Sequence, residues 1–415
     1  METHLADWLR ATPEGLEAEA ILRSCVHCGF CTATCPTYQL LGDELDGPRG
    51  RIYLMKQVME GVEPTRETQV HLDRCLTCRN CESTCPSGVQ YGHLVDIGRG
   101  LVEARVRRPL RERWLRGALR EGLTRRWLFS PAMRLGQWVR PALPSGLRAK
   151  VPARRGPGHR PRRSHARRVI LLRGCVQPAM IPAIDGATER VLDALGIQAV
   201  VAAKSGCCGA IRQHLNDAQG ALDDARRNVD AWWPLLQDGV EAIVVNASGC
   251  GALLVDYGHL LRNDPAYAEK AAQVAAKVQD LAVFLATEES KLAALAQARA
   301  EAAPARRLVF HPPCTLQHGQ QVRGKVESLL TACGATLQPV QESHLCCGSA
   351  GTYSVLQPAL SQTLRDRKLG HLTAGEPEMV LSANIGCLTH LQSGTALPVR
   401  HWIEWMDQAI GTARA

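Results

Sequence analysis

The chain has 415 residues, 45% of them hydrophobic, which suffices for two or three domains with well-formed cores. Its 17 cysteines do not indicate a secreted disulfide scaffold, because such scaffolds are short and these cysteines are spaced like metal ligands. The net charge of +9 is unevenly distributed: residues 101–168 carry 20 Lys and Arg against 3 Asp and Glu, whereas the rest of the chain has 29 against 37.

No stretch of the sequence has the composition of a targeting or membrane-spanning segment. The N-terminal METHLADWLRATPEGLEAEA lacks the apolar core of a signal peptide. No run of about 18 apolar residues occurs that would predict a transmembrane helix. We therefore expect a cytoplasmic protein, in a reducing compartment that keeps thiols free for metal binding.

Residues 1–100 are predicted to form a small helical, ferredoxin-like domain around two [4Fe–4S] clusters. They contain two copies of the run Cys-x2-Cys-x2-Cys-x3-Cys-Pro, in which three thiolates hold one cluster and the fourth reaches the neighbouring cluster. Structural zinc also uses CxxC pairs, but it has no use for the x3-Cys-Pro ending. The predicted ligands are Cys25, Cys28, Cys31 and Cys85 for cluster 1, and Cys75, Cys78, Cys81 and Cys35 for cluster 2.

Between the two cysteine runs, the segment GPRGRIYLMKQVMEGV predicts a helix. Pro48 stands just inside its start, where a helix tolerates proline. Short helices packed around two clusters are the expected architecture. The apolar positions of this helix, interleaved with polar ones, are Ile52, Leu54, Met55, Val58 and Met59.

Residues 101–168 form a separate basic segment. Residues 101–140 are predicted to form arginine-rich helices that carry Trp114, Trp127 and Trp138, and residues 141–168 an extended Pro/Gly/Arg linker. Three interpretations remain open: helices that lie on anionic lipid, a surface that docks acidic partner subunits, or a solvated linker. We expect no nucleic-acid partner, because no recognised binding module accompanies the charge.

The remainder contains an internal repeat, residues 169–300 and 301–415. RVILLRGC and RLVFHPPC open the two units, 31 residues then precede a Cys-Cys-Gly, and EAIVVNASGC and EMVLSANIGC follow. RVILL, AVVAA and EAIVV are typical of strands buried on both faces, and helical periodicity lies between them. We predict a duplicated α/β domain with pseudo-two-fold symmetry, which makes the whole chain an α+β multidomain protein.

Each repeat places four cysteines at the ends of predicted strands, where open α/β sheets build sites. Adjacent cysteines suit a cluster better than a single ion, and the glycine after them allows the positive φ of a tight turn. The alternative is a set of buried thiols without a ligand, as we expect for the leftover Cys333. The first set is Cys175, Cys207, Cys208 and Cys250, and the second is Cys314, Cys346, Cys347 and Cys387.

These repeats resemble the Cys-Cys-Gly domains of heterodisulfide reductase subunits and of iron–sulfur subunits of 2-hydroxyacid and glycerol-3-phosphate dehydrogenases. In the reductases the resemblance implies five cysteines per domain, ending in CxxC, around a non-cubane [4Fe–4S] cluster. Here the last of these positions is Leu253 in the first repeat and His390 in the second. The second repeat is therefore the better candidate for a third cluster, because His390 can replace a thiolate and His311 lies near Cys314. The first repeat is the weaker candidate.

The amino-acid sequence around the cysteines is similar to that of the iron–sulfur subunits of bacterial glycolate oxidases (glycolate dehydrogenases), and the similarity extends over essentially the whole chain. It runs from ILRSCVHCGFCTATCPTYQLLGDELDGPRGRIYLMKQV through HLDRCLTCRNCESTCPSGVQY to SHLCCGSAGTY and ANIGCLTHL. The resemblance implies a complex with two flavin-type subunits, in which glycolate becomes glyoxylate at an FAD in a partner. This chain would then pass electrons to a membrane acceptor such as quinone, as a peripheral protein on the inner face of the cytoplasmic membrane.

No catalytic residue is expected in the chain itself. It has no GxGxxG fingerprint that opens a helix after a strand, and no Ser/His/Asp-type motif can be placed. Substrate chemistry is therefore expected in the partner subunits. The alternative function is that of an electron-transfer subunit in another flavin dehydrogenase or heterodisulfide-reductase-like complex, in which the electron donor is lactate, glycerol-3-phosphate or a dithiol couple.

Overall fold

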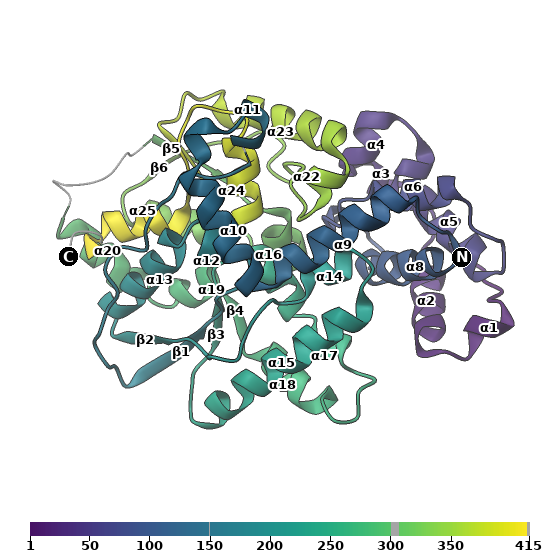
Figure 1. The fold of residues 1–415 in the computed structure, drawn as a ribbon, viewed down its shortest axis with the longest axis horizontal. Coiled ribbons are helices and arrows are strands. Elements are labelled where there is room, and N and C mark those ends of the chain that lie inside the picture. The colour runs from purple at the N-terminus through teal and green to yellow at the C-terminus, as the bar shows by residue number, and fades with distance from the viewer. Residues whose placement is uncertain (149, 300–306, 413–415) are drawn as a thin grey trace.

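The computed structural model describes residues 1–148, 150–299 and 307–412 of the chain. A helical N-terminal part lies beside two parallel sheets that are covered by helices (Figure 1). The chain is therefore a helical cluster domain followed by a duplicated α/β domain, as expected. The boundary expected between residues 300 and 301 lies outside the described residues.

The N-terminal part is built from short helices on one apolar core. α8 packs against α2, α5 and α6, and because it ends at Arg105 this core continues past residue 100. The elements are α1 (Asp7–Arg10), α2 (Pro13–Ser24), α3 (Phe30–Ala33), α4 (Pro36–Leu41), η1 (Glu44–Asp46), α5 (Pro48–Met59), α6 (Arg66–Asp73), α7 (Asn80–Thr84) and α8 (Tyr91–Arg105).

The helix predicted between the two cysteine runs is α5. It begins at Pro48, whose missing N–H costs nothing at a helix start. Four of its five predicted apolar residues are buried, and Leu54 is half-buried. The guanidinium of Arg51 is also buried there, 3.4 Å from a carboxylate oxygen of Asp46, and it ties α5 to η1.

The two sheets have the same topology. The strand order is β2-β1-β3-β4 in the first and β6-β5-β7-β8 in the second, and all pairs are parallel. In both, all strands run the same way, but the order in which the chain adds them reverses beside the first strand, and open α/β sheets bind ligands at such a point. The strands are β1 (Arg167–Leu171), β2 (Ile197–Val200), β3 (Ile243–Val245), β4 (Val278–Asp280), β5 (Arg307–His311), β6 (Thr336–Gln338), β7 (Met379–Ser382) and β8 (Val399–His401).

The strand predicted from AVVAA is displaced. β2 begins at Ile197 and ends at Val200, so residues 201–203 lie beyond it. Its pairing with β1 runs from Arg167 opposite Ile197 to Ile170 opposite Val200, and β1 itself ends at Leu171. The strand therefore ends where its pairing with β1 ends, although the apolar run continues beyond that point.

The two repeats share one apolar core. α13 packs on α25, and Arg190 and Asp407 form a buried ion pair of 2.6 Å between them. The helices of the first repeat are α12 (Gln177–Met180), α13 (Ala183–Ala194), α14 (Ala210–His214), α15 (Ala218–Gln237), α16 (Ser248–Leu254), α17 (Tyr257–Leu260), α18 (Ala268–Ala276), α19 (Leu281–Ala286) and α20 (Glu289–Gln297). Those of the second are the π-helical turn η4 (Thr315–Gly319), α21 (Lys325–Ala332), α22 (Tyr353–Leu356), α23 (Pro358–Thr373), α24 (Ile385–Gln392) and α25 (Trp402–Ala409).

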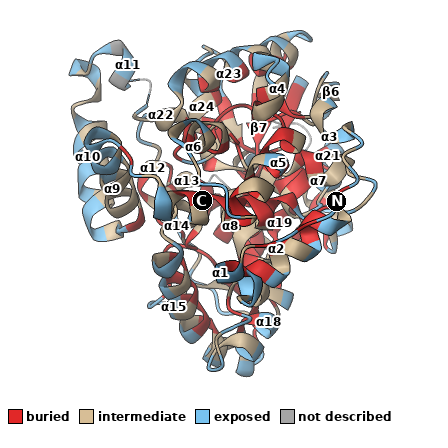
Figure 2. Cartoon of the chain, turned by 90° about the vertical axis from the view of Figure 1, so that its right-hand side faces the viewer, coloured by how far each residue is buried: buried red, intermediate tan, exposed pale blue. Residues whose placement is uncertain are grey.

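The basic segment forms two helices on the outside of the molecule, α9 (Leu110–Thr124) and α10 (Arg126–Trp138), followed by η2 (Arg140–Ala142) and α11 (Ser145–Arg148). Figure 2 shows α9 and α10 at the edge of the molecule with few buried residues. The tryptophans are highly exposed: Trp114 by 78%, Trp127 by 72% and Trp138 by 80%. Among the described residues, no helix combines the length and the apolar character needed to cross a lipid bilayer.

Several arginines of this segment bind carboxylates of the rest of the chain. Arg108 is buried and contacts both Asp73 and Glu103 at 2.6 Å. In the extended stretch that follows, Arg155 pairs with Glu404 at 2.7 Å. Part of the positive charge of the basic segment is thus neutralised within the fold, because its arginines form ion pairs with nearby carboxylates.

Candidate metal centre

The first ferredoxin-type set of cysteines surrounds one cavity. Cys25, Cys28, Cys31 and Cys85 all line it, together with Ile52 from α5. Cys25 comes from the end of α2 and Cys85 from the end of α7, so the fourth cysteine of the second run completes the set of the first. The crossed arrangement expected for two neighbouring clusters is therefore present in the chain.

The second set surrounds a neighbouring cavity, lined by Cys35, Cys75, Cys78 and Cys81. Cys81 also reaches the first cavity, so the two sites adjoin. Burial raises the pKa of the Cys81 thiol well above its usual range. A thiol at such a position would ionise with a cation beside it, which a bound metal would supply.

The backbone of the two cysteine loops repeats the same unusual conformation. His27 and Thr77, each two residues after the first cysteine of its run, have φ of 55° and 50°. Gly29 and Arg79, each directly after the second cysteine, have φ of 87° and 59°. Left-handed backbone at three non-glycine residues is costly and clusters at functional sites, so both loops are shaped to turn their thiols to one point.

Polar groups reach the sulfur atoms of the second set. The Tyr91 hydroxyl donates to Cys75 Sγ at 3.7 Å, and Thr37 Oγ1 lies 3.3 Å from Cys35 Sγ. Arg99 is buried and donates to the carbonyl oxygens of Leu72 and Cys75 at 2.7 Å, which fixes the loop. Hydrogen bonds and nearby charge of this kind set the potential of an iron–sulfur cluster.

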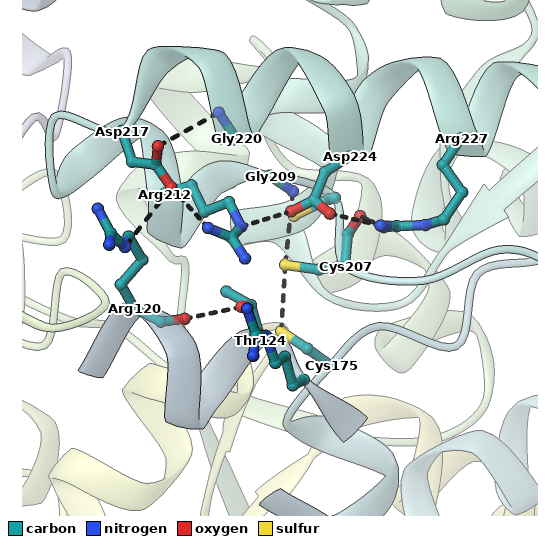
Figure 3. Close-up of polar contacts among 12 residues, drawn as sticks. Arg120, Thr124, Cys175, Cys207, Gly209, Arg212, Asp217, Gly220, Asp224 and Arg227 are labelled. Carbon is teal, nitrogen blue, oxygen red and sulfur yellow. Dashed lines mark hydrogen bonds and ion pairs between the residues drawn. The ribbon is translucent and has the colours of Figure 1, made fainter. Parts of the chain in front are cut away.

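The four cysteines of the first repeat also converge, and Figure 3 shows two of them, Cys175 and Cys207, facing each other. Cys175 Sγ lies 3.5 Å from Cys207 Sγ, and Cys208 contacts both Cys207 and Cys250. Hydrogen bonding with Cys175 and Cys208 lowers the pKa of Cys207 well below its usual range. Gly209 follows with φ of 93°, so the tight turn has the positive φ expected of it.

Charged side chains on α14 and α15 lie beside this first thiol set. Asp224 contacts Arg227 at 2.6 Å and Arg212 at 3.3 Å (Figure 3). Burial, and next the charge of Cys207, raise the pKa of Asp224 to about 6. From the basic segment, Arg126 donates to the carbonyl oxygen of Gly174 at 2.9 Å, so the junction of α9 and α10 is fastened next to this site.

The four cysteines of the second repeat converge in the same way. Cys314 Sγ lies 3.8 Å from Cys346 Sγ, and Cys347 contacts both Cys346 and Cys387. Gly348 completes the turn with φ of 86°, where a Cβ would approach Ser361 O to 2.5 Å. Only glycine fits there without displacing the backbone of α23.

The two histidines singled out in the second repeat differ in their surroundings. His311 Nδ1 or Nε2, Cys347 Sγ and Cys387 Sγ lie within 4.8 Å of one another. Nε2 of His390 instead lies 3.1 Å from both Ser361 Oγ and Ser361 O. The structure thus brings His311, rather than His390, to the thiols. Cys333 lies apart from both sets, buried in the shared core.

The second-repeat thiols adjoin the second ferredoxin-type set. Cys314 and Cys346 belong to one buried apolar cluster with Leu76 and Tyr353, and Cys78 packs against it. Polar contacts fix this junction: Tyr353 OH donates to Arg74 O at 3.1 Å, Asn80 Nδ2 to His344 O at 3.2 Å, and His318 Nδ1 lies 2.9 Å from Ser83 Oγ. Three thiol sites therefore adjoin one another in a row in space, from that of Cys28 through that of Cys78 to that of Cys314.

Comparison with known proteins agrees with this division of the chain. Residues 21–89 match the model of the 4Fe-4S dicluster domain family, and residues 169–255 and 308–392 match that of the cysteine-rich domain family. Over 411 residues, the chain is 54% identical to the glycolate oxidase iron-sulfur subunit of Escherichia coli (strain K12), and the match covers 99% of each protein.

Two further relatives are less similar. A probable glycolate oxidase iron-sulfur subunit of Bacillus subtilis (strain 168) is 32% identical over 406 residues, which are 91% of this chain and 89% of that protein. Lactate utilization protein A of Shouchella clausii (strain KSM-K16) is 24% identical over 241 residues, which are 56% of this chain and 95% of that protein.

Proposed function

The chain belongs to the family of glycolate oxidase iron–sulfur subunits, and from that premise we propose that it carries electrons from a flavin subunit to quinone in the membrane. Glycolate would be oxidised to glyoxylate at FAD in the partner. The observation that carries the proposal is the crossed convergence of the eight ferredoxin-type cysteines around two adjoining cavities. Two neighbouring [4Fe–4S] clusters accept single electrons, which suits a wire between a two-electron flavin and a distant acceptor.

We propose that electrons enter at the first cluster site, because this site reaches the surface. Cys28 is exposed, and the apolar side chains beside it are exposed by 67% at Val26 and by 62% at Phe30. An apolar rim around a redox site is suited to docking a partner subunit. The second site is enclosed between the N-terminal part and the second repeat, and Cys78 faces that repeat's thiols.

We propose that α9 and α10 make the membrane contact. Trp127, Leu128, Leu135 and Trp138 follow one another at helical spacing on α10, and all four are exposed. Among the described residues, Arg111, Arg113 and Arg134 have no acidic partner, so their charge is available to anionic headgroups. Tryptophan with arginine on an exposed helix is typical of a protein that lies on lipid, with the chain peripheral to the inner face of the membrane.

The wire is tested by the Cys78→Ser variant in the complex reconstituted with its flavin subunits. Glycolate-dependent dye reduction should fall to a small fraction of the wild-type rate, because one of the two ferredoxin-type sites loses a ligand. Cys333→Ser, which removes a cysteine outside every set, is the matched control and should keep the rate. Full activity of Cys78→Ser would overturn the proposal. Faster dye reduction with lactate or glycerol-3-phosphate than with glycolate would identify that compound as the electron donor, and the electron-transfer role of the chain would stand.

A further inference from the structure

His311 is a buried histidine without a hydrogen-bond partner. It ends β5, its exposed fraction is 0%, and neither Nδ1 nor Nε2 has a partner among the described residues. Burying a polar group without a partner costs free energy, and most buried polar atoms in proteins are satisfied. A ring that is unsatisfied at both nitrogens therefore indicates that a group outside the protein chain binds one of them.

The surroundings of the ring say what that group is. One ring nitrogen lies within 4.8 Å of the sulfur atoms of Cys347 and Cys387, which in turn continue to Cys346 and Cys314. The ring thus lies beside two of the four converging thiols. Lys368 is also buried, donates to Glu342 O at 2.6 Å and acts electrostatically on these thiols, so a positive charge is held beside groups that must ionise to bind metal.

The first repeat provides an internal comparison. The residue that corresponds to His311 there is Leu172, which is equally buried, and the one that corresponds to Ser382, opposite His311, is Val245. Ser382 Oγ donates to His311 O at 3.0 Å and holds the strand end in place. The same fold therefore carries an imidazole in one copy and only apolar groups in the other. A histidine is not needed to build the strand.

We propose that the second repeat holds a third iron–sulfur cluster with five protein ligands: Cys314, Cys346, Cys347, Cys387 and the imidazole of His311. The proposal deepens the proposed function and rests on it, since the site adjoins Cys78 and would lengthen the wire. His390 is left out of this ligand set, because Ser361 engages its Nε2. The first repeat has Leu172 at the position of His311 and is not assigned a cluster.

The test uses the full chain purified anaerobically, with iron, sulfide and zinc analysis and low-temperature EPR. Wild type should contain about twelve irons, at four per cluster. His311→Leu copies Leu172. It should lower the count to about eight irons and remove one EPR signal. His311→Cys should restore the count with a changed signal. His390→Gln is the matched control and should keep both the count and the signal.

A second readout is independent of folding yield and of activity. In protein labelled with ¹⁵N-histidine, one cluster signal should carry a nitrogen hyperfine coupling that is lost in His311→Cys. About eight irons in wild type, one zinc per chain in place of the third cluster, or a coupling that persists in His311→Cys would each overturn the proposal. Failure of the two-cluster wire is seen separately, as full glycolate-dependent dye reduction in Cys78→Ser.

Discussion

Leu172 and His311 occupy the same position in the two cysteine-rich repeats, and both are buried, yet one is apolar and the other can bind a metal. The strands around them pair in the same register: Ile170 lies opposite Ile243 in the first sheet, and Val309 lies opposite Val380 in the second. The duplication thus keeps the backbone constant while the donor set at the strand ends differs. This difference leads directly to a prediction about where iron is bound.

Removal of one thiol from each repeat should have unequal effects on iron content. Cys314→Ala should lower the content from about twelve to about eight irons per chain, because it removes a ligand of the third cluster. Cys175→Ala, its counterpart in the first repeat, should leave about twelve. Iron analysis of anaerobically purified protein measures both. A loss of about four irons in Cys175→Ala, with none in Cys314→Ala, would place the third cluster in the first repeat instead.

The exposed rim of the first cluster site should control the rate of electron entry. Phe30→Glu places a charge where an apolar side chain is 62% exposed, so docking of the flavin subunit should weaken and glycolate-dependent dye reduction should fall about tenfold or more at limiting subunit concentration. The EPR spectrum of the clusters should stay unchanged. Leu16→Glu, on a side chain that is 59% exposed elsewhere on the N-terminal part, is the control. Equal rates in the two variants would place the entry elsewhere.

Asp280 should make the stability of the fold depend on pH. It ends β4, is buried, and accepts a hydrogen bond from the Ala282 N–H at 2.9 Å. Burial raises its pKa to about 7 from the ordinary value of 3.8. The folded state therefore keeps this proton between about pH 4 and pH 7 while the unfolded state has lost it, so the free energy of unfolding decreases as pH rises through that range.

Asp280→Asn removes this dependence, because the amide keeps the cap and carries no charge. Between pH 5.5 and pH 8, wild type should lose about 2 kcal/mol of unfolding free energy relative to the variant, and no further loss is expected above pH 8. Denaturant unfolding of both proteins at the two pH values measures the difference. Parallel pH profiles would mean that Asp280 is ionised in the folded protein throughout.

The cysteine spacing and the internal repeat were sufficient to predict the architecture, because both are local patterns. The twin cysteine runs anticipate the two crossed sets of cysteines around the adjoining cavities, and the repeated strand and Cys-Cys-Gly sequence anticipates the duplicated sheets. The end of β2 was not predictable from its own apolar run, since it depends on where the neighbouring strand ends.

Two features depended on contacts that local sequence does not encode. His390 and Cys387 are three residues apart on α24, yet the histidine contacts Ser361 of α23, and His311 reaches the thiols from β5. The basic segment reads as uniformly cationic, but Arg108 and Arg155 bind carboxylates 35 and 249 residues away. Which arginines stay free, and hence which surface can meet lipid, follows only from the folded chain.

The face of α10 should bind anionic lipid through tryptophan and arginine together. The full chain should cosediment with vesicles of phosphatidylglycerol and phosphatidylethanolamine but weakly with phosphatidylcholine, and added salt should reduce binding because the arginines act at the surface. The double variant Trp127→Ala/Trp138→Ala should bind at least tenfold more weakly, since two large apolar groups no longer enter the interface. Tyr53→Ala, on an exposed residue of α5, is the control and should bind like wild type. Binding that requires the flavin subunits, or that survives loss of both tryptophans, would assign this face to a protein partner instead.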